Sequence, residues 1–92
     1  MRKPGVLILA PDAREYVPLL ENLVGTANLT IAENVADARL SYGGQPVVLG
    51  QPDLVAAVFS EMPELRWVQS TWAGVEPLLG VVRPGCLLTG IK

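Results

Sequence analysis

Short apolar runs alternate with segments of helical periodicity along the whole chain. Residues 5–10 (GVLILA) are continuously apolar and β-favouring, which predicts a strand buried on both faces, as in a parallel sheet. Asp12 and Glu15 resemble a capping box at the start of a helical pattern, although Pro18 predicts that this helix begins irregularly or later. Asn34 is a candidate cap for a second, shorter helix.

The same alternation continues to the carboxyl end of the chain. The predicted strands are residues 5–10, 28–32, 46–49, 65–70 and 86–89, and the predicted helices are residues 12–24, 34–40, 52–62 and 75–79. In the second helix, the residues expected to face inward are Val35, Ala38 and Leu40. Gly50 closes the third strand, and Pro52 suits the first position of the helix that follows.

Strands that alternate with helices predict right-handed crossovers and a parallel sheet. We expect one α/β domain over residues 1–92, a flavodoxin-like three-layer sandwich with a five-stranded parallel sheet in the order 2-1-3-4-5. Ligands of such sheets bind at the carboxyl edge of the strands. The loops after Ala10, Leu49 and Ser70 are therefore expected to gather at the binding site.

Charge and composition narrow the classes of partner. Half of the residues are apolar, 17% are charged and the net charge is −2, so we expect a packed core rather than disorder. The seven Lys and Arg residues are scattered, which disfavours nucleic-acid binding. No apolar run approaches the ~18 residues of a membrane span. The single cysteine suits the reducing cytoplasm, where we expect the protein to be located.

The absence of histidine excludes several kinds of catalytic and metal site. The chain can form no Ser-His or Cys-His nucleophile pair, no histidine base and no histidine metal ligand. Cys86 is interpreted as an ordinary structural residue rather than a reactive thiol. No G-x-G-x-x-G turn occurs, so a dinucleotide would have no recognisable pyrophosphate site. We expect no metal and no cofactor to be bound by this chain.

One stretch, residues 65–79 (LRWVQSTWAGVEPLL), combines a strand, a turn and the start of a helix. Residues 71–74 would then lie where a strand ends and a helix begins, and free backbone N–H groups at such a place can hold an anion. Trp67 is expected in the core, whereas Trp72 in the turn needs a ligand or a partner surface to cover it. Glu76 would lie in the first helical turn, where the helix dipole favours a carboxylate.

This stretch resembles the D-isomer-specific 2-hydroxyacid dehydrogenases. That family carries a strand–loop–helix segment of the form L-[KR]-W-[IV]-Q-S-x-x-A-G-V-[DE]. The chain matches it at Leu65, Arg66, Trp67, Val68, Gln69, Ser70, Ala73, Gly74, Val75 and Glu76. The first strand, the A-E-N-V-A-D-A segment at residues 32–38, the strand that closes on Gly50 and the final L-L-T are similar more loosely, so the likeness covers nearly the whole chain.

The resemblance implies the substrate-binding, or catalytic, domain of an enzyme that transfers a hydride between NAD(H) or NADP(H) and a small 2-oxo or 2-hydroxy acid, as a glyoxylate or hydroxypyruvate reductase does. In that family role, the backbone N–H groups of Ala73 and Gly74 would bind the substrate carboxylate. The substrate-binding residues that the resemblance implies are Leu49, Gly50, Trp72, Ala73, Gly74 and Val75.

Other parts of the family's machinery have no counterpart in this sequence. The NAD(P)-binding Rossmann domain, the catalytic arginine, its acidic partner and the acid/base histidine are missing, and Gly90 follows Thr89 where the family has L-T-N. We therefore expect a truncated domain that contains no catalytic residue and does not transfer hydride alone. NAD or NADP would be the cofactor of the complete enzyme only.

An alternative interpretation is a non-enzymatic interaction module of flavodoxin-like fold. The excess of apolar residues allows one face to remain uncovered and to pair with another chain. On this ground we expect a homodimer, with the missing Rossmann domain or a second copy of the chain as the protein partner, and neither nucleic acid nor membrane as a partner. A free-standing receiver or flavin-binding domain is a weaker third interpretation, because its specific site residues are lacking.

Overall fold

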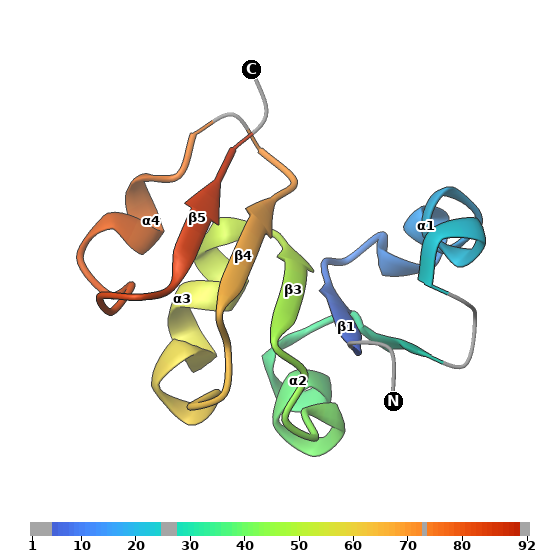
Figure 1. The fold of residues 1–92 in the computed structure, drawn as a ribbon, viewed down its shortest axis with the longest axis horizontal. Coiled ribbons are helices and arrows are strands. Elements are labelled where there is room, and N and C mark those ends of the chain that lie inside the picture. Colours follow the sequence, from blue (N-terminus) through green and yellow to red (C-terminus); the bar gives the residue numbers. More distant parts are fainter. Residues whose placement is uncertain (1–4, 25–27, 73, 91–92) are drawn as a thin grey trace.

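Five parallel strands form one sheet in the order β2-β1-β3-β4-β5, as predicted (Figure 1). The computed structural model describes residues 5–24, 28–72 and 74–90, without the side chains of residues 22–24. The strands are β1 (Val6–Leu9), β2 (Leu29–Ala32), β3 (Val47–Gly50), β4 (Trp67–Ser70) and β5 (Leu87–Thr89). The helical elements are the 3-10 helix η1 (Ala13–Tyr16), α1 (Val17–Val24), α2 (Val35–Ser41), α3 (Pro52–Val58), the 3-10 helix η3 (Phe59–Glu61) and α4 (Glu76–Leu79). The flavodoxin-like α/β fold is confirmed.

The first helix begins later than the capping-box pattern indicates. Asp12 makes no side-chain capping hydrogen bond, and a 3-10 turn precedes α1, which starts at Val17. Pro18 explains this start, because proline has no N–H to donate and is tolerated only in the first turn of an α-helix. The prediction of an irregular or late start is confirmed, and the prediction of a cap at Asp12 is wrong.

The second helix has the predicted cap and, except at Leu40, the predicted inner face. Asn34 Oδ1 accepts a hydrogen bond of 2.8 Å from the backbone N–H of Asp37, which satisfies one free donor of the first turn. Ala38 is buried, as expected, but Leu40 is 87% exposed. Leu40 lies five residues after Val35, about 140° around the helix from it, so it cannot share the same inner face.

The main core lies between the sheet and the helices α2, α3 and α4. Its buried residues are Leu7, Leu9, Ala32, Ala38, Val48, Val55, Val58, Phe59, Met62, Leu65, Val68 and Leu78. Because side chains alternate between the faces of a strand, Leu7, Val48 and Val68, which are register partners, all point to this side. Arg83 donates hydrogen bonds to the carbonyls of Met62, Pro63 and Leu65, just before β4.

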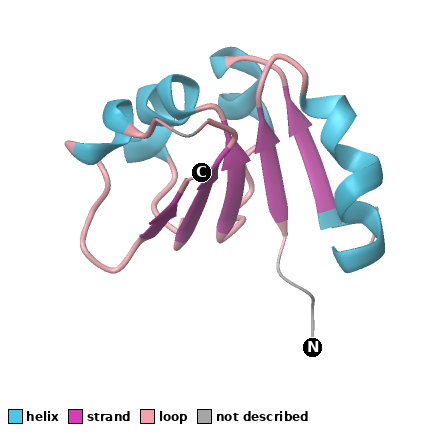
Figure 2. Ribbon diagram, turned by 90° about the horizontal axis from the view of Figure 1, so that it is seen from above, coloured by secondary structure: helices cyan, strands magenta, loops and turns pink. Residues whose placement is uncertain are grey.

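The opposite face of the sheet is covered over only part of its width. Val6, Ile8 and Ala13 form a smaller core, against which side chains of η1, α1, β2 and β3 pack. No element of the described chain packs over the same face of β4 and β5, and the ribbon seen from above has helix on this side at one end of the sheet only (Figure 2). Leu87 is accordingly 57% exposed there.

Trp67 lies on this uncovered face, so the prediction that it belongs to the core is wrong. It is 39% exposed, and its register partners are Val47 on β3 and Leu87 on β5. The sequence places a large apolar residue in a strand correctly, but burial also requires a helix over that strand, and α1 does not extend so far across the sheet.

Candidate functional site

Three loops meet at the carboxyl edge of the sheet, where the ligand site was predicted. The backbone N–H of Gln51, just after β3, donates to the carbonyl of Leu9 at 2.9 Å. The N–H of Thr71, just after β4, donates to the carbonyl of Gly50 at 3.0 Å. These bonds continue the sheet pairing by one residue, so the loops that follow β1, β3 and β4 begin side by side.

Gly50 lies at the centre of this edge and must be a glycine. It is buried, and a Cβ added to it would collide with Val55 of α3 and lie 3.2 Å from the carbonyl oxygen of Leu9. The absence of a side chain therefore allows α3 to pack against the end of β3. The neighbouring Leu49 is half-buried and points to the other face, where it packs against the smaller core.

Ser70 fixes the first residues of the loop after β4. Its side chain is fully buried, and its Oγ accepts a hydrogen bond from the N–H of Trp72 at 2.8 Å and donates to the carbonyl of Trp72 at 2.7 Å. The N–H of Trp72 is therefore engaged within the chain. The indole of Trp72 is 44% exposed, as its place in a turn predicts.

The rest of the predicted anion site lies between Trp72 and α4. Ala73, to which the resemblance assigns a carboxylate-binding N–H, lies outside the described residues. Gly74 and Val75 are half-buried and directly precede α4, whose four residues make one helical turn. A single turn has a small macrodipole, so an anion here depends on individual N–H groups more than on the helix.

The side chain of Glu76 brings a negative charge to the same place. A Cβ built on Gly74 would lie 2.7 Å from Oε2 of Glu76, so the carboxylate is folded back over the loop. A carboxylate in this position favours the start of the helix but repels an incoming anion.

Tyr16 is a neighbour of the site that the sequence analysis did not identify. Its hydroxyl interacts with the side chain of Thr71, so η1 adjoins the loop after β4. Burial raises the pKa of Tyr16, and the negative charges of Asp12 and Glu15 raise it further, whereas the interaction with Thr71 acts in the opposite direction. The sequence shows Tyr16 only as one apolar position of a helical pattern.

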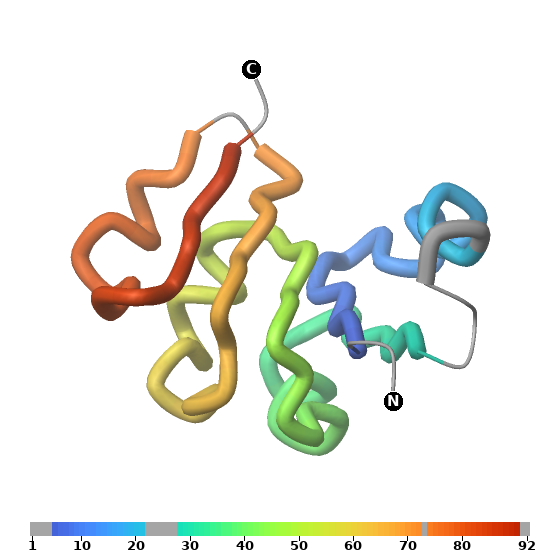
Figure 3. The backbone as a smooth tube through the Cα atoms, in the orientation of Figure 1, coloured from blue at the N-terminus to red at the C-terminus, as the bar shows by residue number. Residues whose placement is uncertain are grey.

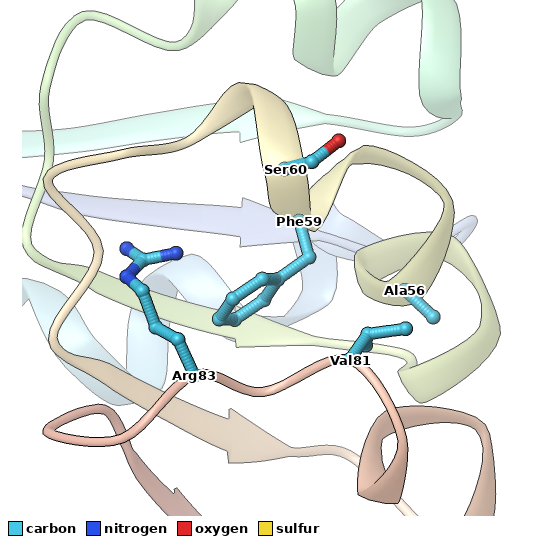
Figure 4. Close-up of a pocket in the computed structure, with 5 residues that line it drawn as sticks. All are labelled: Ala56, Phe59, Ser60, Val81 and Arg83. Carbon is cyan, nitrogen blue, oxygen red and sulfur yellow. The ribbon is translucent and has the colours of Figure 1, made fainter.

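A surface cavity of about 300 Å³ lies elsewhere, on the side of the sheet covered by α3 (Figure 4). Its lining residues are Ala56, Phe59, Ser60, Val81 and Arg83. The guanidinium of Arg83 is engaged structurally: it donates to the carbonyls of Met62, Pro63 and Leu65 at 2.7–3.1 Å and lies 4.7 Å from the centre of the Phe59 ring. These carbonyls precede β4, so the cavity lies away from the carboxyl edge.

The described part of the chain offers no cluster of ligands for a metal. No group of three Cys, Asp or Glu side chains with suitable placement occurs in residues 5–24, 28–72 and 74–90. Burial raises the pKa of the Cys86 thiol, and the positive charge of Arg83 only partly opposes this effect. The thiolate is thus disfavoured, which agrees with a structural role for Cys86. In the same residues, no helix is long and apolar enough to cross a bilayer.

The fold of the chain is similar to that of a solved dehydrogenase. The structure of a D-isomer specific 2-hydroxyacid dehydrogenase family protein from Aeromonas salmonicida subsp. salmonicida A449 superposes with a TM-score of 0.80 over 98% of this chain, at 29% sequence identity. The resemblance to this dehydrogenase family is confirmed. The chain spans 30% of the length of that protein, so the likeness concerns one part of a larger dehydrogenase.

The other two comparisons add no relative. No protein-family model matches the chain, and no curated protein matches it. The dehydrogenase likeness therefore depends on the shared fold, on the 29% identity and on the motif at residues 65–76.

Proposed function

We propose that this chain is the substrate-binding part of an NAD(P)-dependent D-2-hydroxyacid dehydrogenase and that it holds the carboxylate of a small 2-oxo or 2-hydroxy acid. The observation that carries the proposal is the likeness to the Aeromonas salmonicida protein over 98% of this chain. The geometry of the site supports the proposal as well, because the loops after β1, β3 and β4 meet at one edge of the sheet.

In this proposal the anion lies against the backbone of residues 72–75. The N–H groups of Ala73 and Gly74 donate to the carboxylate, and Trp72 and Val75 flank it. The buried Gly50 allows the end of β3 to approach the ligand without a side chain between them. The exposed indole of Trp72 is free to cover an organic acid or to contact a neighbouring domain.

The chemistry of hydride transfer would come from elsewhere in such an enzyme. NAD or NADP would supply the hydride, and these 92 residues contain neither a G-x-G-x-x-G turn to bind it nor a histidine to move the proton. We therefore propose that the chain binds the acid weakly and does not reduce it alone. The comparison gives no support to the alternative of a self-associating module.

The electrostatics of Glu76 provide a test of the proposed site. If the carboxylate of the ligand lies over Gly74, Glu76→Gln removes a repulsion of about 1 kcal/mol at 4 Å in water. The affinity for glyoxylate, measured by ligand-observed NMR at low ionic strength, should then rise about two- to fivefold. Added salt should reduce the difference between the two proteins.

Glu64→Gln is the matched control for this experiment. It removes the same charge from an exposed residue in the turn before β4, at the opposite edge of the sheet. Its affinity for glyoxylate should equal that of the wild-type chain. Equal gains from both substitutions would assign the effect to net charge and would count against a site over Gly74.

A further inference from the structure

A chain of side-chain hydrogen bonds crosses the uncovered face of the sheet from β5 to the end of β4. Nε1 of Trp67 donates to Oγ1 of Thr89 at 2.8 Å, and Oγ1 of Thr89 donates to Oε1 of Gln69 at 2.6 Å. Nε2 of Gln69 then donates to the carbonyl of Ser70 at 3.1 Å. The series ends at the last residue of β4, directly before the loop that carries the proposed anion site.

The indole of Trp67 determines which groups donate and which accept along this series of hydrogen bonds. An indole N–H can only donate, so the hydroxyl of Thr89 must accept from Trp67. The hydrogen of that hydroxyl is then available for Gln69, whose Oε1 must accept it. The amide of Gln69 is thereby held in one orientation, with its Nε2 directed to the carbonyl of Ser70.

The carbonyl of Ser70 lies one residue beyond the described pairing of β4 with β5. Among the described residues this pairing runs as far as Gln69 and Thr89, and the tube trace shows the two segments side by side (Figure 3). The side chain of Gln69 supplies a donor to this carbonyl. The hydroxyl of Ser70 meanwhile binds both the N–H and the carbonyl of Trp72.

We propose that Thr89, Gln69 and Ser70 are positioning residues, which hold Thr71 and Trp72, the first residues of the loop after β4, in one conformation beside the proposed carboxylate site. This inference rests on the proposed function above. A loop held in its binding conformation before the ligand arrives binds more tightly, because less ordering accompanies binding. The side chains of Gln69 and Thr89 thus lie on the uncovered face of β4 and β5, whereas the buried side chain of Ser70 lies on the opposite face.

Thr89→Val tests the proposal, because valine keeps the shape of threonine but neither accepts from Trp67 nor donates to Gln69. We expect the amide hydrogen of Trp72 to exchange with solvent about tenfold faster, and the dissociation constant for glyoxylate to rise about three- to tenfold. Thr89→Ser retains the hydroxyl and should restore both values. A merely structural role would change the melting temperature without this rescue of affinity.

Thr30→Val is the matched control on the other edge of the sheet. The Thr30 hydroxyl accepts a hydrogen bond of 3.2 Å from Nε2 of Gln45, far from the loop after β4. This variant should leave both the Trp72 exchange rate and the glyoxylate affinity as they are in the wild-type chain.

Two results would overturn the inference, and they differ from a failure of the proposed function. Unchanged Trp72 exchange in Thr89→Val would show that the loop does not depend on the hydrogen-bond series. Faster exchange with unchanged glyoxylate affinity would show that the series holds the loop but does not serve binding. If the wild-type chain binds no glyoxylate, the proposed function fails and the positioning role fails with it, whatever the exchange rates.

Discussion

At the scale of single residues, Gly50 has the most demanding environment of the site. Gly50→Ala would press a methyl group against Val55 and the carbonyl of Leu9. We expect the free energy of unfolding, measured by urea denaturation, to fall by about 1–3 kcal/mol, as for other overpacked positions. Gly80→Ala is the control: its added methyl meets nothing within 4 Å and its φ is −93°, so stability should stay within about 0.5 kcal/mol. Equal stability of both variants would contradict the packing described for β3 and α3.

Cys86 gives a prediction about pH. Because burial raises the pKa of its thiol, the folded chain should react with a disulfide reagent more slowly at pH 8 than the same chain unfolded in urea. The same shift makes stability depend on pH, because the pKa of Cys86 is higher in the folded chain than in the unfolded chain. Its contribution to the free energy of unfolding is complete below the unfolded pKa and is lost as pH rises through the folded pKa. A native thiol that reacts as fast as the unfolded one would show that Cys86 is not held in this environment.

Some residue environments could be predicted from the sequence and others could not. The end of β3 at Gly50 and the cap at Asn34 were predictable because each depends on residues nearby in sequence, whereas the close approach of the Leu9 carbonyl to Gly50 was not. The contact of Tyr16 with Thr71 was not, because it joins residues far apart in sequence and leaves no periodic trace. The error for Trp67 has the same origin, since its exposure depends on how far α1 extends across the sheet.

At the scale of elements, the cap of α2 is the most local test. Asn34→Ala removes the hydrogen bond that the side chain accepts from Asp37 and should lower the free energy of unfolding by about 0.5–2 kcal/mol. Gln51 occupies the same position before α3 but makes no capping hydrogen bond with its side chain, so Gln51→Ala should cost clearly less. Chemical denaturation of the two variants measures both losses of stability. Equal losses would show that the side chain of Asn34 does not stabilise the helix as a cap.

The type and length of most elements could be predicted. The strands and the helices α2 and α3 follow from apolar periodicity and from Pro52 at the first helical turn. The short fourth helix, Glu76–Leu79, also agrees with the predicted residues 75–79. This shortness matters for function, because it shifts the expected anion binding from a helix dipole to the loop before it.

At the scale of the whole molecule, the sheet has one complete layer of helices and one incomplete layer. The strand order follows from the alternation of strands and helices, and both the order and the covered face agree with expectation. The excess of apolar residues in the sequence indicated that one face could remain uncovered, but it did not indicate that this face is at β4 and β5. The surface found there contains Trp67 and Leu87, and it also carries the hydrogen-bonded series that ends at the candidate site.

The central claim is that the backbone after β4 holds the carboxylate of a small 2-oxo acid. The most direct measurement is a titration of the ¹⁵N-labelled chain with glyoxylate, beside glycolaldehyde, which lacks the carboxylate, while the backbone amide resonances are followed by NMR. The account predicts saturable shifts at Trp72, Gly74 and Val75, with smaller ones at Gly50, for glyoxylate only. No saturable shift at these residues, an equal response to glycolaldehyde, or shifts centred on Arg83 instead would contradict it.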